Sequence, residues 1–441
     1  MKITVAGAGY VGLVTSVCLA ELGHEVICID IQSDKIETLQ EGCSPIYEPE
    51  LEPLLQRNLK AGRLYFTKNS RYAYSDADVI FIAVGTPQDE DGTANLDQVY
   101  DVTETIALHI EKDVIISTKS TVPVGTNEKI KRIIDSRKLP KLQIDIVANP
   151  EFLREGSAVF DFFYGDRIVL GAENDESAQV LEKIYLPLKI PIIKTDIRSA
   201  EMIKYASNAF LATKISFVNE IARMCEKVGA NIDDVTYGIG KDQRIGPYFL
   251  KAGLGYGGSC FPKDTRALMQ TSGSLGHHFE LLEAVIQVNN RQKSYAVMKA
   301  KEILPSIKGS KVAVLGLSFK PNTDDVREAA SITVIKELLE EGATVMAYDP
   351  IAIKNAKKIF GNAIDYTDHI QTAIQKADLT IITTDWEQIK QFPLDQYSLY
   401  MREPRVIDGR NCYRLEEVRK HPLIYVSVGR PTVITTLTSR M

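Results

Sequence analysis

Several features that would place a protein in a specialised class are missing from these 441 residues. No run of about 18 apolar residues occurs, so a transmembrane helix is not expected. The net charge of -6 leaves neither a basic surface for nucleic acid nor a polybasic membrane anchor. The opening MKITVAGAGYVG lacks the charged, apolar and small-residue pattern of a secretion signal. We therefore expect a cytoplasmic protein with no nucleic-acid or membrane partner.

Cysteine and histidine are also scarce. The six cysteines form no CxxC pair and no Cys/His cluster, so neither disulfides nor a metal site is expected. A functionally special cysteine would have to act alone. The six histidines do not lie in turns suited to a site, although histidine is the commonest proton acceptor in alcohol oxidation.

The length and the apolar runs predict the domain organisation. A chain of 441 residues is typical of about three domains. Short runs rich in β-branched residues, separated by helical spacing, predict an open and mostly parallel sheet in the first block; they are 3–6, 25–30, 78–84, 113–121 and 144–150. The same rhythm of strand, turn and helix returns at 311–320, 343–350 and 377–385. Its first turn is Gly316-Leu317-Ser318, which lacks the later glycines, so a second dinucleotide site is not expected. We predict an α/β protein with two doubly wound, Rossmann-like domains (1–198 and 301–441) joined by an all-helical domain (199–300).

The central block has no strand pattern between Ser199 and about Gln292. Its residues 202–228 read as one long helix with apolar positions on both faces. Such a helix needs partners on more than one side, so we expect part of it to form a subunit interface. The alternative is a helix buried within a single large chain.

The glycine motif Gly7-Ala8-Gly9-Tyr10-Val11-Gly12 follows a predicted strand and opens a predicted helix. The first glycine allows the tight turn, the second lets a pyrophosphate approach the backbone, and the third lets helix pack on strand. Asp30 closes the next strand, where a carboxylate would bind ribose hydroxyls and disfavour NADP. Lys35 is a candidate extra contact, and its alternative is a solvated helix lysine.

Two further groups of residues suggest chemistry. Lys204 and Asn208 are four apart on the long helix, so an ammonium and an amide could together hold a substrate oxygen that gains negative charge. The alternative is a surface lysine and an interior amide. The segment 149–158 brings Glu151 and Glu155 into a turn before a helix, and 318–328 brings Lys320 and Arg327, which suit a pyrophosphate unless they are ordinary solvent charges.

The stretch GYGGSCFPKD (255–264) places a thiol in a glycine-rich frame. Pro262 suits the first turn of a helix over 262–270, so Cys260 would lie at a helix N-terminus near Lys263. Both effects favour the thiolate and lower the pKa of the thiol. A thiolate near a nicotinamide could capture an aldehyde, and Asp264 could hold water or receive a proton. The alternative is a small buried hydrophobic residue.

Taken together, the motifs resemble those of the UDP-glucose 6-dehydrogenases, in the same order and over nearly the whole chain. They are GAGYVG with Asp30, IYEPEL (46–51), VGTP (84–87), STVPVGT (120–126), NPEFLREGSA, the Lys204/Asn208 helix, GYGGSCFPKD and FKPNTDDVRE. The resemblance implies an NAD-dependent enzyme that oxidises carbon six of UDP-glucose twice to give UDP-glucuronate. It also implies a homodimer built on the central helices.

The resemblance also implies roles for individual residues. Cys260 would be the nucleophile, Lys204 and Asn208 would hold the oxyanion, and Asp264, Thr118, Glu151 and Glu155 would assist proton transfer and thioester hydrolysis. Substrate contacts would be Phe152, Leu153, Lys204, Asn208, Arg244, Phe249, Gly257 and Lys320, with Arg244 reaching the neighbouring subunit. Cofactor contacts would be Gly7, Gly9, Tyr10, Val11, Gly12, Asp30, Lys35, Thr86, Thr121, Glu155, Lys263 and Arg327.

One departure and three alternatives accompany the resemblance. Glu50 stands in YEPEL where many members have glycine, which puts a loop in doubt. Sister enzymes acting on GDP-mannose or UDP-N-acetylmannosamine share the architecture, although FPKD and the segment 245–250 look like the UDP-glucose branch. A one-step β-hydroxyacid dehydrogenase would have no use for Cys260 or a third domain. An NAD-binding redox regulator would not need the full set of reactive residues.

Overall fold

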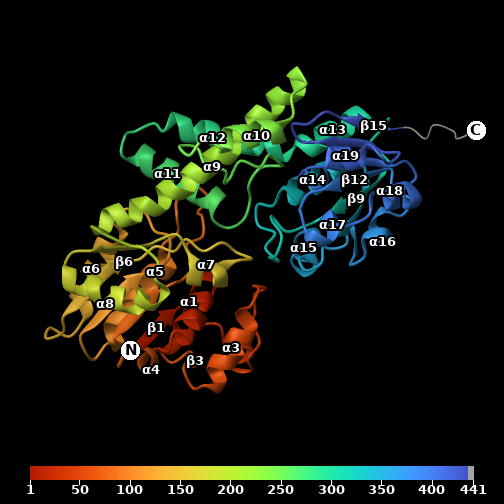
Figure 1. Cartoon of the computed structure of the whole chain (residues 1–441). Coiled ribbons are helices and arrows are strands. Elements are labelled where there is room, and N and C mark those ends of the chain that lie inside the picture. Colours follow the sequence, from red (N-terminus) through yellow and green to blue (C-terminus); the bar gives the residue numbers. More distant parts are fainter. Residues whose placement is uncertain (436–441) are drawn as a thin grey trace, which may run out of the picture. The chain divides into compact units, whose positions relative to one another are not determined.

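The computed structural model describes residues 1–435 and contains two β-sheets flanked by helices (Figure 1). The chain divides into two compact units. The first comprises Met1–Ser207 and Arg266–His277, and the second comprises Asn208–Thr265 and the chain from His278 onward. The predicted three-domain boundaries stay a proposal, and the end of the third domain lies outside the described residues.

The first unit is built on an eight-stranded sheet of order β3-β2-β1-β4-β5-β6-β7-β8, in which only β6 and β7 pair antiparallel. The strands are β1 (Lys2–Ala6), β2 (Glu25–Ile29), β3 (Leu64–Thr67), β4 (Val79–Ile82), β5 (Val114–Thr118), β6 (Ile144–Ala148), β7 (Ile168–Ala172) and β8 (Ile192–Thr195). The helices are α1 (Tyr10–Glu21), α2 (Ser33–Gln40), α3 (Leu51–Lys60), α4 (Ser70–Tyr74), α5 (Asp97–His109), α6 (Thr126–Arg137), α7 (Ala158–Tyr164), α8 (Asp175–Tyr185) and the 3-10 helix η1 (Leu186–Leu188).

The central strands of this sheet are apolar because helices cover both faces. All four residues of β4 and all five of β5 are buried, which is why β4 reads as a continuous apolar run, while β5 is apolar at 114–116 and ends in the buried Ser117 and Thr118. The strand order reverses between β1 and β4. In open α/β sheets the carboxyl ends of the strands at such a point form the ligand site.

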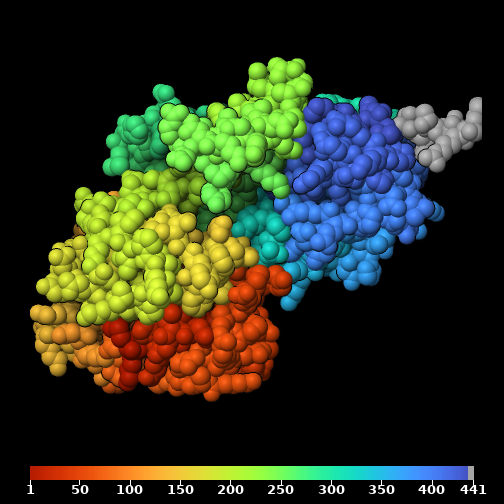
Figure 2. Space-filling model, in the orientation of Figure 1, coloured from red at the N-terminus to blue at the C-terminus, as the bar shows by residue number. Residues whose placement is uncertain are grey.

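Five helices without intervening strands follow β8 along the chain. They are α9 (Ile197–Val228), α10 (Ile232–Gly240), α11 (Phe261–Ser274), α12 (Glu280–Lys293) and α13 (Tyr295–Ile303). This confirms the predicted helical central region, although α9 begins five residues before the predicted start at 202. The light-green chain that includes the end of α9 and α10 is at the surface in the space-filling view (Figure 2).

The second unit contains a seven-stranded sheet of order β11-β10-β9-β12-β13-β14-β15, parallel except for β14 with β15. The strands are β9 (Lys311–Leu315), β10 (Thr344–Tyr348), β11 (Asp365–Thr367), β12 (Leu379–Ile382), β13 (Arg405–Asp408), β14 (Ile424–Ser427) and β15 (Val433–Ile434). Its helices are α14 (Ala330–Glu340), α15 (Ile353–Phe360), α16 (Ile370–Ile374), α17 (Glu387–Lys390), α18 (Leu394–Tyr400) and α19 (Leu415–Val418). The predicted fold class is confirmed.

The predicted strands were too long at their carboxyl ends. The pattern predicts a strand over the run 113–121, but β5 ends at Thr118, and Lys119 and Ser120 lie outside it. In the run 311–320, by contrast, β9 ends at Leu315, directly before the turn predicted at Gly316-Leu317-Ser318. After β5 the chain continues with Lys119, Ser120 and the β-branched Thr121, without a glycine or proline, so composition alone does not mark the end of this strand.

Candidate active site

The glycine motif forms a close turn between β1 and α1. Gly7 has a φ of +102, and a Cβ there would lie 2.8 Å from the carbonyl oxygen of Ala83. A Cβ at Gly12 would overlap the carbonyl of Gly7, so helix and turn can pack only with glycine present. A Cβ at Gly9 would meet no atom within 4 Å, so Gly9 borders open space where α1 begins. This cradle fits the pyrophosphate of a dinucleotide.

Asp30 is tied to the same turn. Its Oδ2 accepts hydrogen bonds from the Ala8 amide at 2.8 Å and from Lys35 Nζ at 3.0 Å, and Oδ1 accepts one from the Gln32 amide at 3.0 Å. Burial opposes ionisation of Asp30, but the two amide bonds and Lys35 outweigh it and lower the pKa of the carboxyl. Asp30 is thus an ionised acceptor at the end of β2, as ribose hydroxyls require, and Lys35 contacts it directly.

The IYEPEL motif anchors the segment that carries the candidate glutamates, a role that the sequence analysis missed. Glu48 is buried, and its two carboxylate oxygens accept hydrogen bonds of 2.6 Å from the amides of Gly156 and Ala158. The Tyr10 hydroxyl accepts a second bond from Gly156, at 2.7 Å. A carboxylate at the start of α7 also complements the helix dipole. The signal available in the sequence was the acidic Glu48 in the IYEPEL motif, which lies far along the chain from Glu151 and Glu155.

Glu151 and Lys204 form a buried ion pair. Lys204 Nζ lies 3.0 Å from Glu151 Oε1, and each side chain is only 5% exposed. The Leu153 amide donates to Glu151 Oε2 at 2.5 Å, and Lys204 Nζ lies 5.4 Å from the centre of the Phe152 ring. The structure therefore brings together four predicted residues: Glu151, Phe152, Leu153 and Lys204. Their ammonium and carboxylate groups are almost completely shielded from solvent.

Thr118 belongs to a buried polar chain that reaches helix α9. Its hydroxyl donates to Asn127 Oδ1 at 2.6 Å, and the side-chain amide of Asn127 donates to Glu201 Oε1 at 2.7 Å. Glu201 also accepts from the Gly125 and Asn127 amides, yet burial dominates and raises the pKa of its carboxyl. Glu201 lies three residues before Lys204, so this chain fixes α9 to the end of β5. The sequence analysis did not single out Asn127 or Glu201.

The remaining predicted residues of the first unit lie around these groups. The Thr86 hydroxyl donates to the carbonyl oxygen of Thr121 at 3.0 Å, which joins the loops after β4 and β5. Glu155 is half-buried, whereas Glu151 is fully buried. The two glutamates therefore occupy different environments, although the sequence could not distinguish them.

In the second unit, Cys260 ends the glycine-rich loop directly before α11. The Asp264 amide donates to the carbonyl oxygen of Cys260 at 2.8 Å, so the half-buried Cys260 is the N-cap residue of this helix. Pro262 lies in the first turn, as predicted, and the helix continues to Ser274 rather than 270. The Ser259 hydroxyl lies 3.6 Å from Cys260 Sγ.

The glycines before Cys260 are required by close packing. A Cβ at Gly258 would lie 2.8 Å from the Phe319 ring, and one at Gly257 would overlap the carbonyl of Glu328. The Gly258 amide donates to the carbonyl oxygen of Arg327 at 2.9 Å. The FKPNTDDVRE segment after β9 thus determines the path of the cysteine loop.

Asn208 and Lys263 both contact Asp264. Asn208 Nδ2 donates to Asp264 Oδ2 at 2.6 Å, and Lys263 Nζ lies 2.6 Å from Oδ1. The Asp264 side chain is 1% exposed. A carboxylate held by an amide and an ammonium lies one helical turn after the thiol of Cys260, so one helix end carries a side chain that can act as a nucleophile and one that can accept a proton.

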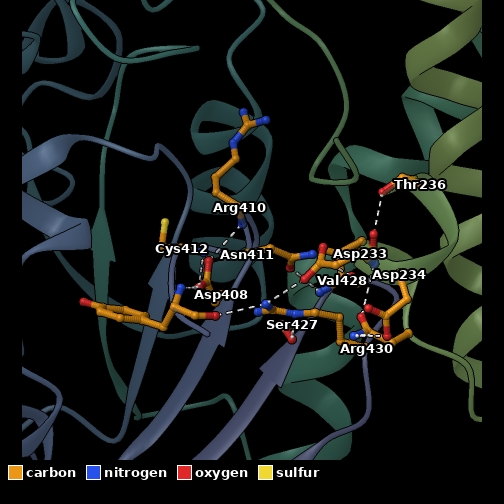
Figure 3. A network of polar contacts seen from close by, with 12 residues as sticks. Asp233, Asp234, Thr236, Asp408, Arg410, Asn411, Cys412, Ser427, Val428 and Arg430 are labelled. Atoms are coloured by element: carbon orange, nitrogen blue, oxygen red, sulfur yellow. Dashed lines mark hydrogen bonds and ion pairs between the residues drawn. The ribbon is translucent and has the colours of Figure 1, made fainter. Parts of the chain in front are cut away.

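Arg410, which the sequence analysis missed, supports the cysteine loop. It follows β13, and its guanidinium donates to the carbonyl oxygens of Thr383, Gly255 and Phe319 at 2.7, 3.3 and 3.2 Å. Figure 3 shows this side chain pointing away from Asp408, which accepts the Arg410 and Cys412 amides. The available signal was a charged residue in the loop that follows a parallel strand.

Other predicted ligand contacts are engaged locally. Arg244 pairs with Asp242 at 2.6 Å with its side chain 90% exposed, and Arg327 pairs with Asp325 at 2.7 Å. Lys320 Nζ lies 5.2 Å from the centre of the Phe319 ring. Phe249 has a φ of 62 and its ring is 6.1 Å from that of Phe261. The ligand roles of these four residues stay predictions.

Residues 1–435 contain neither a candidate metal-binding cluster nor a helix that could span a membrane. No group of three His, Cys, Asp or Glu side chains in this range could hold a metal ion. Within the same range, every helix is too short or too polar to cross a membrane.

Comparisons with known protein families cover most of the chain. Residues 1–189 match the NAD binding domain of the UDP-glucose/GDP-mannose dehydrogenase family. Residues 198–291 match the central domain of that family, and residues 313–415 match its UDP binding domain.

Individual relatives are similar over their full length. The chain is 54% identical to UDP-glucose 6-dehydrogenase YwqF of Bacillus subtilis (strain 168), over 98% of this chain and 99% of that protein. It is 47% identical to UDP-glucose 6-dehydrogenase TuaD of the same organism, over 98% and 94%. A solved UDP-glucose dehydrogenase from Pyrobaculum islandicum is 39% identical with a TM-score of 0.91, covering 98% of each chain. A solved UDP-D-ManNAc dehydrogenase from Pyrococcus horikoshii is 26% identical with a TM-score of 0.85, covering 98% of this chain and 99% of that one.

Proposed function

Because the chain belongs to the UDP-glucose/GDP-mannose dehydrogenase family, we propose that it oxidises UDP-glucose to UDP-glucuronate with NAD. The observation that carries the chemistry is Cys260 capping α11 one turn before the buried Asp264. The substrate is supported by the 54% and 47% identity to relatives named UDP-glucose 6-dehydrogenases.

The proposed reaction consists of two oxidations and a hydrolysis. NAD, when bound, accepts a hydride in each oxidation. After the first oxidation, the Cys260 thiolate adds to the C6 aldehyde and forms a thiohemiacetal. The second oxidation leaves a thioester, and water then breaks its C–S bond to give the carboxylate and return the thiol. Four electrons leave the sugar for two NAD, and the cysteine is unchanged overall.

Lys204 and Asn208 are proposed to stabilise the oxygen on C6 as it gains charge. The pairing of Lys204 with Glu151 at 3.0 Å and of Asn208 with Asp264 at 2.6 Å supports this proposal. In each pair a carboxylate already fixes the position of the donor side chain. From that position the donor can turn to a substrate oxygen. The paired carboxylates are then available to receive protons.

The proton-handling roles divide among four residues. Asp264 is proposed to orient the hydrolytic water and Glu151 to accept a proton through Lys204. Glu155 is more exposed than Glu151, which suits a contact with solvent or cofactor. Thr118 donates its hydroxyl hydrogen to Asn127, so its proposed assistance to water rests on the lone pairs of that hydroxyl.

The proposed partner is a second copy of this chain. Phe210, Phe217 and Met224 follow one another at intervals of seven on α9, and they are 66%, 55% and 55% exposed. Seven residues are two helical turns, so these side chains form one apolar stripe. Their exposure argues against the alternative of a helix buried within one chain.

The cytoplasmic location stays a prediction.

Light scattering tests the dimer. Phe217→Asp should lower the measured mass from that of a dimer to that of a monomer, because it places a charge in the stripe. Phe160→Asp on α7 is the matched control, since Phe160 is similarly exposed, at 56%. A monomeric wild type, or a Phe217→Asp variant that remains dimeric, would contradict the proposal.

The activity is tested by its stoichiometry. With UDP-glucose limiting, about two NADH should form for each sugar consumed, because the proposed path removes four electrons. A ratio of about one would mean that the aldehyde leaves. Higher kcat/KM with GDP-mannose or UDP-N-acetylmannosamine would favour a sister activity, and no NADH with any nucleotide sugar would favour a redox regulator.

A further inference from the structure

Lys119 is a buried amine to which the proposed mechanism assigns no role. It follows β5, and its amide donates to the carbonyl oxygen of Ile82 at 2.8 Å, which fixes the backbone. Its Nζ lies 5.9 and 5.4 Å from the ring centres of Phe81 and Tyr185. Lys119 is 7% exposed and forms no ion pair with any residue that the structure describes. Lysine is rarely buried without a direct counter-ion, because desolvating the charge is costly.

The neighbouring strand brings Glu151 to the same region. Thr118 of β5 is in register with Ala148 of β6, and the carbonyl oxygen of Thr118 accepts from the Asn149 amide at 3.0 Å. The hydroxyl of Tyr185, whose ring contacts Lys119, donates to Asn149 Oδ1 at 2.6 Å. Glu151 follows two residues later. The carboxyl ends of two paired strands thus hold Lys119 and Glu151 in fixed backbone positions.

The charged groups that face Lys119 are Glu151 and Lys204. Burial lowers the pKa of Lys119 to about 8, with Glu151 raising it and Lys204 lowering it. The other titratable group in contact is Tyr185, whose phenol stays neutral because burial raises its pKa. Lys119 and Lys204 are therefore two cations that interact with each other and with one carboxylate.

We propose that Lys119 is a positioning residue for the oxidation and acts through Glu151. Glu151 has one direct cationic partner, Lys204, at 3.0 Å. When Lys204 turns to the substrate oxygen, as the proposed function requires, Glu151 shares that partner with the substrate while it remains buried. Lys119 then keeps the carboxylate ionised and in place, so that Glu151 can accept a proton during the oxidation.

The pH dependence of turnover tests the proposal. Lys119→Met should move the acidic limb of the kcat profile up by roughly one pH unit, because a cation near a carboxylate favours its ionised form. Lys119→Arg should restore the limb. Lys129→Met is the matched control, since the Lys129 ammonium also lies over a ring, that of Tyr100 at 4.0 Å. A lowered kcat with an unmoved limb would mean that Lys119 is only structural, and the proposal would fail.

A second experiment does not depend on activity and therefore separates this proposal from the proposed function. In protein labelled with 13C at the lysine ε-carbon, one resonance should titrate near pH 8 and be missing from Lys119→Arg. Glu151→Gln should move that titration to lower pH, because it removes the charge that favours the ammonium. An unchanged titration in Glu151→Gln would overturn the coupling, even if the enzyme oxidised UDP-glucose as proposed.

Discussion

The side-chain amide of Asn208 donates a hydrogen bond of 2.6 Å to Asp264, one helical turn after Cys260. A buried carboxylate thus fixes the amide of Asn208. The amide would therefore already be oriented when a substrate oxygen arrives. This arrangement supports a role in the transition state rather than in general binding.

Replacing Asn208 by alanine tests that role. We expect kcat to fall by about 10²- to 10³-fold with little change in KM, because such a donor stabilises charge that develops during the reaction. Asn362→Ala, at an exposed position, is the control. A melting temperature close to that of the wild type would exclude unfolding, and a change confined to KM would contradict the assignment.

Replacing Cys260 by serine should abolish turnover while leaving ligand binding intact. A serine hydroxyl is a poor nucleophile without a strong base, so we expect a loss of about 10³-fold or more in NADH formation. Calorimetry with UDP-glucose should give a similar affinity for variant and wild type. Cys43→Ser, at an exposed cysteine, should behave as wild type. A Cys260→Ser enzyme with normal turnover would rule out covalent catalysis.

Lys119 should make stability depend on pH. Its usual pKa of 10.5 is lowered to about 8 by burial, so between these values the unfolded chain binds a proton that the folded chain does not. The stability of the wild type should therefore rise from pH 8 to 10.5 by roughly 3 kcal/mol. Lys119→Met should lack this rise and be more stable than wild type below pH 8.

Urea unfolding at several pH values measures the difference. Lys129→Met should retain the wild-type pH dependence, because Lys129 is exposed. If the stability difference between Lys119→Met and wild type were the same at pH 7 and pH 10, the depressed pKa would be refuted.

Glu50 should be more stable as glycine. Its φ is 66, in the left-handed region, where a side chain is strained and glycine is not. We expect Glu50→Gly to stabilise the fold by about 0.5–1 kcal/mol, measured by denaturant unfolding. Glu41→Gly is the contrasting variant: Glu41 also flanks a helix, but its φ of -74 suits any residue. Its replacement should be neutral or destabilising, and equal effects of the two variants would contradict the strain argument.

The departure at Glu50 shows what a sequence comparison leaves open. The resemblance stated for the sequence marked Glu50 only as a departure that put a loop in doubt. The backbone angle gives the physical reason, because the residue that precedes α3 must adopt a left-handed conformation whatever its side chain.

The sequence alone determined the class of fold and the chemistry of the main candidates. Apolar runs at 3–6 and 311–320 were enough to place two parallel sheets, because strands covered on both faces must be continuously apolar. The glycine spacing before Asp30 was readable for a similar local reason: a tight turn at a helix start tolerates few other residues.

Only the tertiary structure decided which polar side chains meet. Lys204 was chosen for its spacing from Asn208, but its partner Glu151 is 53 residues away in the sequence. Glu201 and Lys119 carry no local pattern that separates them from solvated charges, and only its place in the IYEPEL motif distinguishes Glu48. Burial decides their roles, because a charge excluded from water must find a partner or change its proton affinity. Burial is a property of the packed chain and not of the local sequence.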